Sequence, residues 1–421
     1  MKNIKSFLQQ YQILGKNLIW RIFQKLSKVI IDFMLLFISS LLLGDVLFGT
    51  YEYLLILMGF FVIIGEFGLS ASVGKYIAEN SIKSKEKVDS VIASSIFMFF
   101  IYCFIVFIVF LTSNILFFNL NITYFLYLIM LLLLISATNL FDGIFIGTKQ
   151  FKKSSIVTLI PGVFILPLSY VLISNYSING ALLTHIIYYF LLIILMIKFT
   201  HIKNMHYDKE FISKILRYSL IIGFAGIGSF LYTNIDAIIL QQYEFTVEVG
   251  YFQIAFYVFN LFILPCSLFG QVISPYIAQK GIKREYSKIN SYLKKIWIID
   301  ILGILIALGG FFVGPIFFKI FFPDYATNSL FSIWNLLLIL IPFKFHNAIL
   351  IHGFIYPLGQ GKITMILTVI GGVLNVLLDY IFIDFMGFIG VIYSTVIIHV
   401  IVVILTSVFF YLKRKKKNYK N

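Results

Sequence analysis

Long apolar segments constrain what this chain can fold into more than any other feature of its sequence. One segment after another holds about 20 predominantly apolar residues, the length that a helix needs to cross the hydrocarbon core of a bilayer. Of the 421 residues, 60% are hydrophobic and only 12% are charged. A soluble domain is about 25% charged, and too little sequence remains here between the segments for an independent domain. The composition therefore excludes a soluble enzyme, a nucleic-acid-binding domain and a secreted scaffold.

The apolar segments lack the alternating polarity of β-barrel strands, so they predict helices. We therefore predict an all-α polytopic membrane protein with about 12 transmembrane helices. The spans are expected at 18–43, 48–68, 90–112, 122–146, 156–174, 179–199, 215–240, 250–272, 294–318, 328–352, 363–383 and 387–412. Cys103 and Cys266 each lie in an apolar run, which argues against a disulfide framework or a metal cluster.

Lysine and arginine predict the orientation of the chain, because cytoplasmic loops carry an excess of positive charge. The loops after the even-numbered spans are basic, and those after the odd-numbered spans are mainly acidic. The basic residues are Lys83, Lys85, Lys87, Lys149, Lys152, Lys153, Lys203, Lys209, Lys214, Lys280, Lys283, Arg284, Lys288, Lys362 and the tail KRKKK. Both termini are therefore predicted to be cytoplasmic. This topology, together with attraction to anionic headgroups, explains the net charge of +15 without nucleic acid as a partner.

The chain resembles itself at a spacing of roughly 200 residues, which predicts an internal repeat. Residues 159–180 align without gaps on residues 369–390. The alignment pairs Gly162 with Gly372, Tyr170 with Tyr380 and Gly180 with Gly390. We therefore predict two parallel six-helix bundles around a central cavity, at 1–200 and 201–412, followed by a basic cytoplasmic tail at 413–421. Parallel repeats of this kind are typical of transporters that work by alternating access.

Four ionisable residues of the first span share one helical face, because they are spaced four, three and four positions apart. They are Arg21, Lys25, Lys28 and Asp32. The three cations suit a hydrated cavity that admits an anionic substrate, and the fork of arginine matches phosphate. Two alternatives remain at this point: the basic side chains reach the cytoplasmic headgroups, or Asp32 neutralises Lys28 one turn away.

Other intramembrane charges complete the set of candidate site residues. Lys344, in the tenth span, is the best second cationic site for substrate. Glu66 and Asp236, with Asp32, are candidates for ion coupling or gating, and Asp142 and Asp300 are considered with them. For each carboxylate, structural pairing or placement at the membrane interface is the alternative. No catalytic, ATP-binding or metal-binding motif occurs in the sequence, so neither an enzyme nor a resident cofactor is expected.

Several stretches resemble the Wzx-type O-antigen and polysaccharide flippases. These are the basic face of the first span, FGTYEYLLILMGFFVIIGEFGLSASVGKYIAE, NIDAIILQQYEFTVEVGYFQIAFYVFNLFILPCSLFGQVISPYIA and IGGVLNVLLDYIFIDFMGFIGVIYSTVI. The superfamily of those flippases also contains multidrug exporters and the lipid II flippase. The resemblance implies an undecaprenyl-diphosphate-linked oligosaccharide as cargo, moved from the cytoplasmic to the outer leaflet of a bacterial inner membrane by an ion or proton gradient. It also implies that Arg21, Lys25 and Lys28 face the cavity, whereas the role of Lys344 is inferred from burial alone.

Two other functions stay open. An exporter of drugs or metabolites would have the same architecture but would carry cationic cargo in an acidic cavity. A polysaccharide polymerase would usually need a large outer loop with catalytic residues, and the outer loops here are short. By resemblance, membrane lipid is a partner, and a polymerase and a chain-length regulator are possible neighbours.

Overall fold

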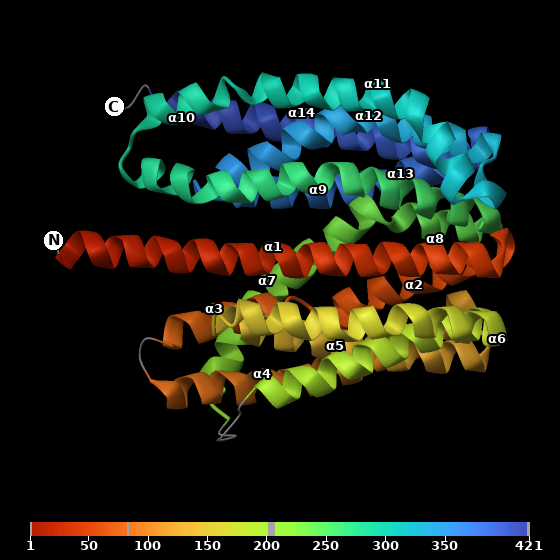
Figure 1. Cartoon of the computed structure of the whole chain (residues 1–421), viewed down its shortest axis with the longest axis horizontal. Helices are drawn as coiled ribbons and strands as arrows, with labels where there is room; N and C mark the ends of the chain where they lie inside the picture. Colours follow the sequence, from red (N-terminus) through yellow and green to blue (C-terminus); the bar gives the residue numbers. More distant parts are fainter. Residues whose placement is uncertain (1, 82–83, 201–206, 419–421) are drawn as a thin grey trace. The chain divides into compact units, whose positions relative to one another are not determined.

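The computed structural model describes residues 2–81, 84–200 and 207–418, and every regular element in these ranges is a helix (Figure 1). The basic residues Lys83 and Lys203 lie outside the described residues, as do the last three residues of the predicted tail. The helices are α1 (Lys2–Leu43), α2 (Asp45–Glu66), α3 (Leu69–Asn80), α4 (Lys85–Ser113), η1 (Asn114–Phe118), α5 (Ile122–Gly147), α6 (Phe151–Phe199), α7 (Lys209–Thr233), α8 (Ile235–Gln242), α9 (Thr246–Ile282), α10 (Tyr286–Leu293), α11 (Ile296–Phe321), η2 (Pro323–Tyr325), α12 (Asn328–Leu350), η3 (Ile351–Ile355), α13 (Gly361–Met386) and α14 (Phe388–Asn418).

The all-α polytopic prediction is confirmed. Within the described ranges, 11 helical segments are long and apolar enough to cross a membrane. One of them is α6, whose 49 residues contain two of the predicted spans. The backbone of Ser177 is non-helical and separates these two spans, which accounts for the predicted number of about 12.

The chain forms two compact units. The first unit contains Met1–Leu43 and Leu54–Ile227, and the second contains Gly44–Tyr53 and Gly228–Asn421. The helices α2 and α7 therefore each contribute residues to both units. The expected bundles at 1–200 and 201–412, and the cavity between them, stay predictions.

The two units contain the same tight turn at corresponding positions of the sequence repeat. Ser177 has φ 53° and ψ −133°, and Gly387, between α13 and α14, has φ 63° and ψ −152°. Three residues later, Gly180 packs against the backbone of Leu172, and Gly390 packs in the same way against the backbone of Phe382. A Cβ atom has no room at either glycine. Both units thus fold a pair of antiparallel helices around the same tight turn.

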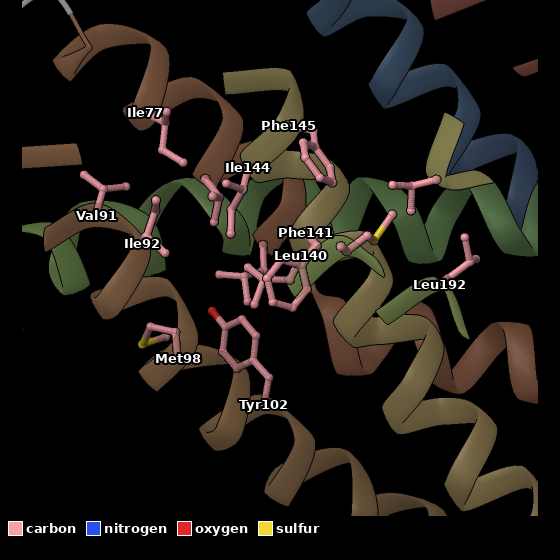
Figure 2. Close-up of a cluster of buried hydrophobic side chains, with 14 of the residues drawn as sticks. Ile77, Val91, Ile92, Met98, Tyr102, Leu140, Phe141, Ile144, Phe145 and Leu192 are labelled. Atoms are coloured by element: carbon pink, nitrogen blue, oxygen red, sulfur yellow. The ribbon is translucent and has the colours of Figure 1, made fainter. Parts of the chain in front are cut away.

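The interior of the first unit is apolar (Figure 2). Buried side chains from α3, α4, α5 and α6 meet there, and the figure labels Ile77, Val91, Ile92, Met98, Tyr102, Leu140, Phe141, Ile144, Phe145 and Leu192. The hydroxyl groups of Tyr102 and Ser219 are 2.7 Å apart, which joins α4 to α7. Because lipid is as apolar as this core, close packing and interhelical hydrogen bonds hold such helices together.

Candidate functional site

The basic face of α1 begins with an ion pair. The Nη1 atom of Arg21 lies 3.0 Å and 3.1 Å from the two carboxylate oxygens of Asp142 on α5. Both side chains are about one quarter exposed, at 26% and 24%. The sequence placed Arg21 with Lys25 and Lys28 but did not pair it with Asp142, which is 121 positions away in the chain.

Buried polar side chains surround this ion pair. Gln24, one turn after Arg21 on α1, accepts a hydrogen bond from Arg21 Nη1 at 2.6 Å and donates one from Nε2 to Asp142 at 3.1 Å. Ser154 Oγ on α6 donates to the same carboxylate at 3.1 Å, and Gln24 Nε2 lies 3.4 Å from Thr158 Oγ1. Gln24, Ser154 and Thr158 are all buried. Three helices therefore converge on Arg21 and Asp142.

Lys28 lies two turns further along α1 and has a different environment. Its side chain is exposed, and its Nζ atom is 5.8 Å from the ring centroid of Tyr189 on α6. Lys28 interacts electrostatically with Asp32, one turn away, and with His185. Lys28 thus lies within electrostatic range of Asp32 and near an aromatic ring, and the pairing of Lys28 with Asp32 stays a prediction.

Glu66 joins the same charged group from the end of α2. Its carboxylate accepts a hydrogen bond from Asn139 Nδ2 on α5 at 2.8 Å and interacts electrostatically with Lys28 and Asp142. The helix breaks directly after Glu66, where Phe67 and Gly68 both have positive φ. Three cations of α1 are therefore accompanied by three carboxylates, Asp32, Glu66 and Asp142. The sequence predicted a cationic face that ends in Asp32, and the structure adds that α2 and α5 bring two further carboxylates, remote in sequence, to this face.

The second unit contains a buried pair of carboxylic acids. Asp236 on α8 is fully buried and accepts hydrogen bonds from Asn375 Nδ2 at 2.7 Å and from Thr395 Oγ1 at 2.8 Å. Asp379 on α13 is also fully buried and accepts a hydrogen bond from Ser394 Oγ. Asn375 Nδ2 lies 3.3 Å from the Asp379 carboxylate, so this one amide donates to both acids. Two buried carboxyl groups are therefore joined through Asn375.

Asp379 is not among the site residues predicted from the sequence. This residue lies in the eleventh span, within the repeated segment at 369–390. The rule that singled out Asp236, a lone carboxylate in an apolar span, applies equally to Asp379 and would have found it. What the sequence could not supply was the contact between the two residues.

Lys344 belongs with the acidic pair of the second unit. Its Nζ atom is 5.1 Å from the ring centroid of Tyr232, and the ammonium interacts electrostatically with Asp236 and His399. His399 Nε2 is 2.8 Å from the carbonyl oxygen of Tyr232. A cation, two acids and a histidine thus lie close together near the junction between α7 and α8. Elsewhere in this unit, His346 Nδ1 lies 3.0 Å from Asp300.

No group of three or more His, Cys, Asp or Glu side chains that could hold a metal ion occurs in the described part of the chain. A two-carboxylate site, by contrast, can exchange its proton for a monovalent cation when hydroxyl and amide oxygens complete the ligand set. Asn375 Oδ1 is buried beside the acidic pair, with no hydrogen-bond partner among the described residues.

Comparison with solved structures shows which class of membrane protein has this fold. A multidrug-resistance MATE family transporter of the MOP superfamily, in an inward-facing conformation, matches with a TM-score of 0.75 and 16% identity over 94% of this chain and 95% of that one. The lipid II flippase MurJ matches with a TM-score of 0.70 and 18% identity over 96% and 87%. A MOP superfamily transporter from Pyrococcus furiosus, described as having a binding pocket of reverse polarity, matches at 0.66 and 17% over 96% and 95%. The fold is that of the MOP superfamily of transporters.

The family follows from the sequence model that matches. The model for the family described as polysaccharide biosynthesis protein covers residues 14–280, well over half of the chain. The chain belongs to this family. The resemblance of its sequence to the Wzx-type polysaccharide flippases is thereby confirmed. No curated protein matches the sequence.

Proposed function

We propose that this protein is a flippase for an undecaprenyl-diphosphate-linked oligosaccharide, such as an O-antigen or capsule repeat unit. It moves this lipid by alternating access from the cytoplasmic to the outer leaflet of a bacterial inner membrane, with both of its own termini in the cytoplasm. The observation that carries the proposal is the group of Arg21, Lys25 and Lys28 on one face of α1, in a chain of the polysaccharide biosynthesis family. The fold shared with the lipid II flippase MurJ supports it.

The chemistry of the cargo explains the need for such a site. The lipid diphosphate carries the charge that opposes crossing, and the glycan carries hydroxyl groups that lose water in an apolar medium. Cations in a hydrated cavity lower the first barrier, and polar side chains lower the second. Because the exposed Lys28 lies deeper along α1 than the paired Arg21, the two cations offer successive contacts to a diphosphate that enters from the cytoplasm.

The pair of Asp236 and Asp379 is our candidate for coupling transport to an ion gradient. It is buried, its two acids share the side-chain amide of Asn375, and Lys344 lies within electrostatic range of it. Binding of a proton or of a monovalent cation changes the charge of this group by one. A change of one charge in a dry environment biases a conformational equilibrium strongly.

The proposal is tested by the amount and sidedness of lipid-linked oligosaccharide in the native bacterium. The gene is deleted, and either wild type or the double variant Arg21→Ala/Lys28→Ala is restored at equal protein level. We expect complete repeat units to accumulate on the cytoplasmic leaflet after deletion, and only wild type to clear them. Full clearance by the double variant would reject the cationic site.

One observation favours a second function. The three cations are balanced by Asp32, Glu66 and Asp142, and the fold is also that of multidrug exporters. If glycan lipids are unchanged after deletion, export of a drug or metabolite becomes the function to pursue. If repeat units reach the outer leaflet but stay unpolymerised, the result favours a polysaccharide polymerase instead. The neighbouring polymerase and chain-length regulator stay predictions.

A further inference from the structure

We infer that Asp142 is a positioning residue for Arg21: with Gln24 it holds one edge of the guanidinium so that the opposite edge is presented to a diphosphate. The inference rests on the proposed function and concerns the regulation of the same site. A carboxylate beside a cationic anion-binding residue can instead be a competitor of the ligand. The geometry of the hydrogen bonds distinguishes the two roles.

Within the described part of the chain, all the hydrogen bonds of Arg21 are made by one nitrogen atom. Nη1 donates to Gln24 and to both oxygens of Asp142. Nη2 and Nε have no hydrogen-bond partner among the described residues, and together they form one edge of the planar guanidinium. This edge carries the parallel donors that bind phosphate in a bidentate manner. The Arg21 side chain is 26% exposed, so the protein covers it only in part.

The group that holds Arg21 is itself anchored. Asp142 receives hydrogen bonds from Gln24 and Ser154 in addition to Arg21, and Gln24 reaches Thr158. Gln24, Ser154 and Thr158 are each more than nine-tenths buried. Together with Asp142, these residues come from α1, α5 and α6. The group that holds the arginine is therefore anchored on three helices. An incoming anion would have to break several buried hydrogen bonds to displace Asp142, whereas the free edge is available without breaking any.

The sign of one substitution separates positioning from competition. Asp142→Asn removes a negative charge beside Arg21 and keeps the shape of the side chain. If Asp142 only competes, the variant binds an anion more tightly, because the net positive charge of the site has risen. If Asp142 positions the arginine, the variant binds more weakly, because the guanidinium is free to turn.

The test measures undecaprenyl diphosphate binding to the purified full-length protein in nanodiscs of phosphatidylethanolamine and phosphatidylglycerol. We expect Asp142→Asn to weaken binding about tenfold, the scale of one charge-assisted hydrogen-bond pair. Arg21→Lys, which keeps the charge but lacks the fork, should weaken it to a similar degree. In the Arg21→Lys background, Asp142→Asn should add little, because no planar edge remains to be oriented.

Two variants keep the test decisive. Asp384→Asn also removes a carboxylate, but one that is exposed and hydrogen-bonded to Tyr243 rather than to Arg21 or its partners, and it should leave affinity unchanged. Gln24→Leu removes the neutral support of Arg21 without changing charge, so it tests the same point if Asp142→Asn does not fold. Equal or tighter binding by Asp142→Asn, with wild type binding normally, overturns the inference alone. Absence of binding by wild type overturns the proposed function, and the inference with it.

Discussion

Asp236 and Asp379 are fully buried, yet each receives hydrogen bonds from side chains of neighbouring helices. Burying a carboxylate is costly unless it is hydrogen-bonded or paired with a cation, and here Asn375, Ser394 and Thr395 supply the hydrogen bonds. In the first unit, by contrast, Asp32, Glu66 and Asp142 are only partly buried, and each has a cation of α1 nearby. The acidic pair of the second unit has Lys344 within electrostatic range of Asp236.

Asp379→Asn tests the role of the acidic pair. The variant can no longer exchange a proton or cation at position 379, so transport should lose its response to an imposed gradient. We expect at least tenfold slower gradient-driven flipping in proteoliposomes, the effect of about 1.4 kcal/mol. The matched control is Asp384→Asn on the same helix, whose exposed carboxylate accepts a hydrogen bond from Tyr243 and should leave the response intact. A gradient response preserved in Asp379→Asn would remove this pair from the coupling mechanism.

At the scale of elements, the tight turn of the repeat shows how one backbone shape accepts two different residues. Gly387 and Ser177 share φ near 60° with an extended ψ, a region that is essentially reserved for glycine. The first unit holds a serine in this conformation because Gly180, three residues on, is packed tightly against the preceding helix. The turn is therefore determined by the packing around it as much as by its own residue.

Ser177→Gly should stabilise the protein, since it removes backbone strain at a position where glycine has none. Strain of this kind costs about 1–3 kcal/mol of folding free energy. Glycine offsets about 0.5–1 kcal/mol of the gain, because it makes the unfolded chain more flexible. We expect a net gain of about 1 kcal/mol, measured as a higher midpoint of thermal unfolding in detergent. Gly387→Ser should show the opposite shift. If both variants unfold at the wild-type temperature, the turn is not strained in either unit.

At the scale of the whole molecule, α2 and α7 each give residues to both compact units. A chain divided between α6 and α7 would therefore yield two fragments that are each incomplete. With the chain divided after residue 206, the first fragment lacks residues 207–227 of its own unit, and the second lacks residues 44–53 of its own.

Fragments 1–206 and 207–421 should each be sensitive to protease when expressed alone. Expressed together, they should form a resistant complex that restores clearance of lipid-linked oligosaccharide. The reason is that missing packing partners leave helices loosely held, and association supplies those partners. Limited proteolysis in isolated membranes measures this, with the uncut chain as reference. Full resistance of either fragment on its own would show that the two segments are dispensable for its unit.

Much of the fold could be predicted from sequence, because apolar length and glycine spacing are local signals. The spans, the equivalence of Gly180 and Gly390, and the shared face of Arg21, Lys25 and Lys28 needed no knowledge of distant contacts. The partners of those residues did need it. Asp142 reaches Arg21 because α6 packs against both α1 and α5, and no spacing rule encodes which carboxylate meets which cation. The division of α2 between two units could not be predicted from the sequence either, because it also depends on contacts with distant residues.

The placement of residues 44–53 has a consequence for biosynthesis. Gly49 packs against the backbone of Thr246, so the first turns of α2 find their neighbour only after roughly 200 further residues have been made. At about 5–20 residues per second, that interval lasts on the order of 10–40 seconds. During this time the segment, with the buried carboxylate Glu52 within it, is already in the bilayer without its final partner. Insertion of this segment into the membrane thus precedes its packing against its partner. In the interval, a newly made chain depends on its membrane surroundings for contacts to this segment.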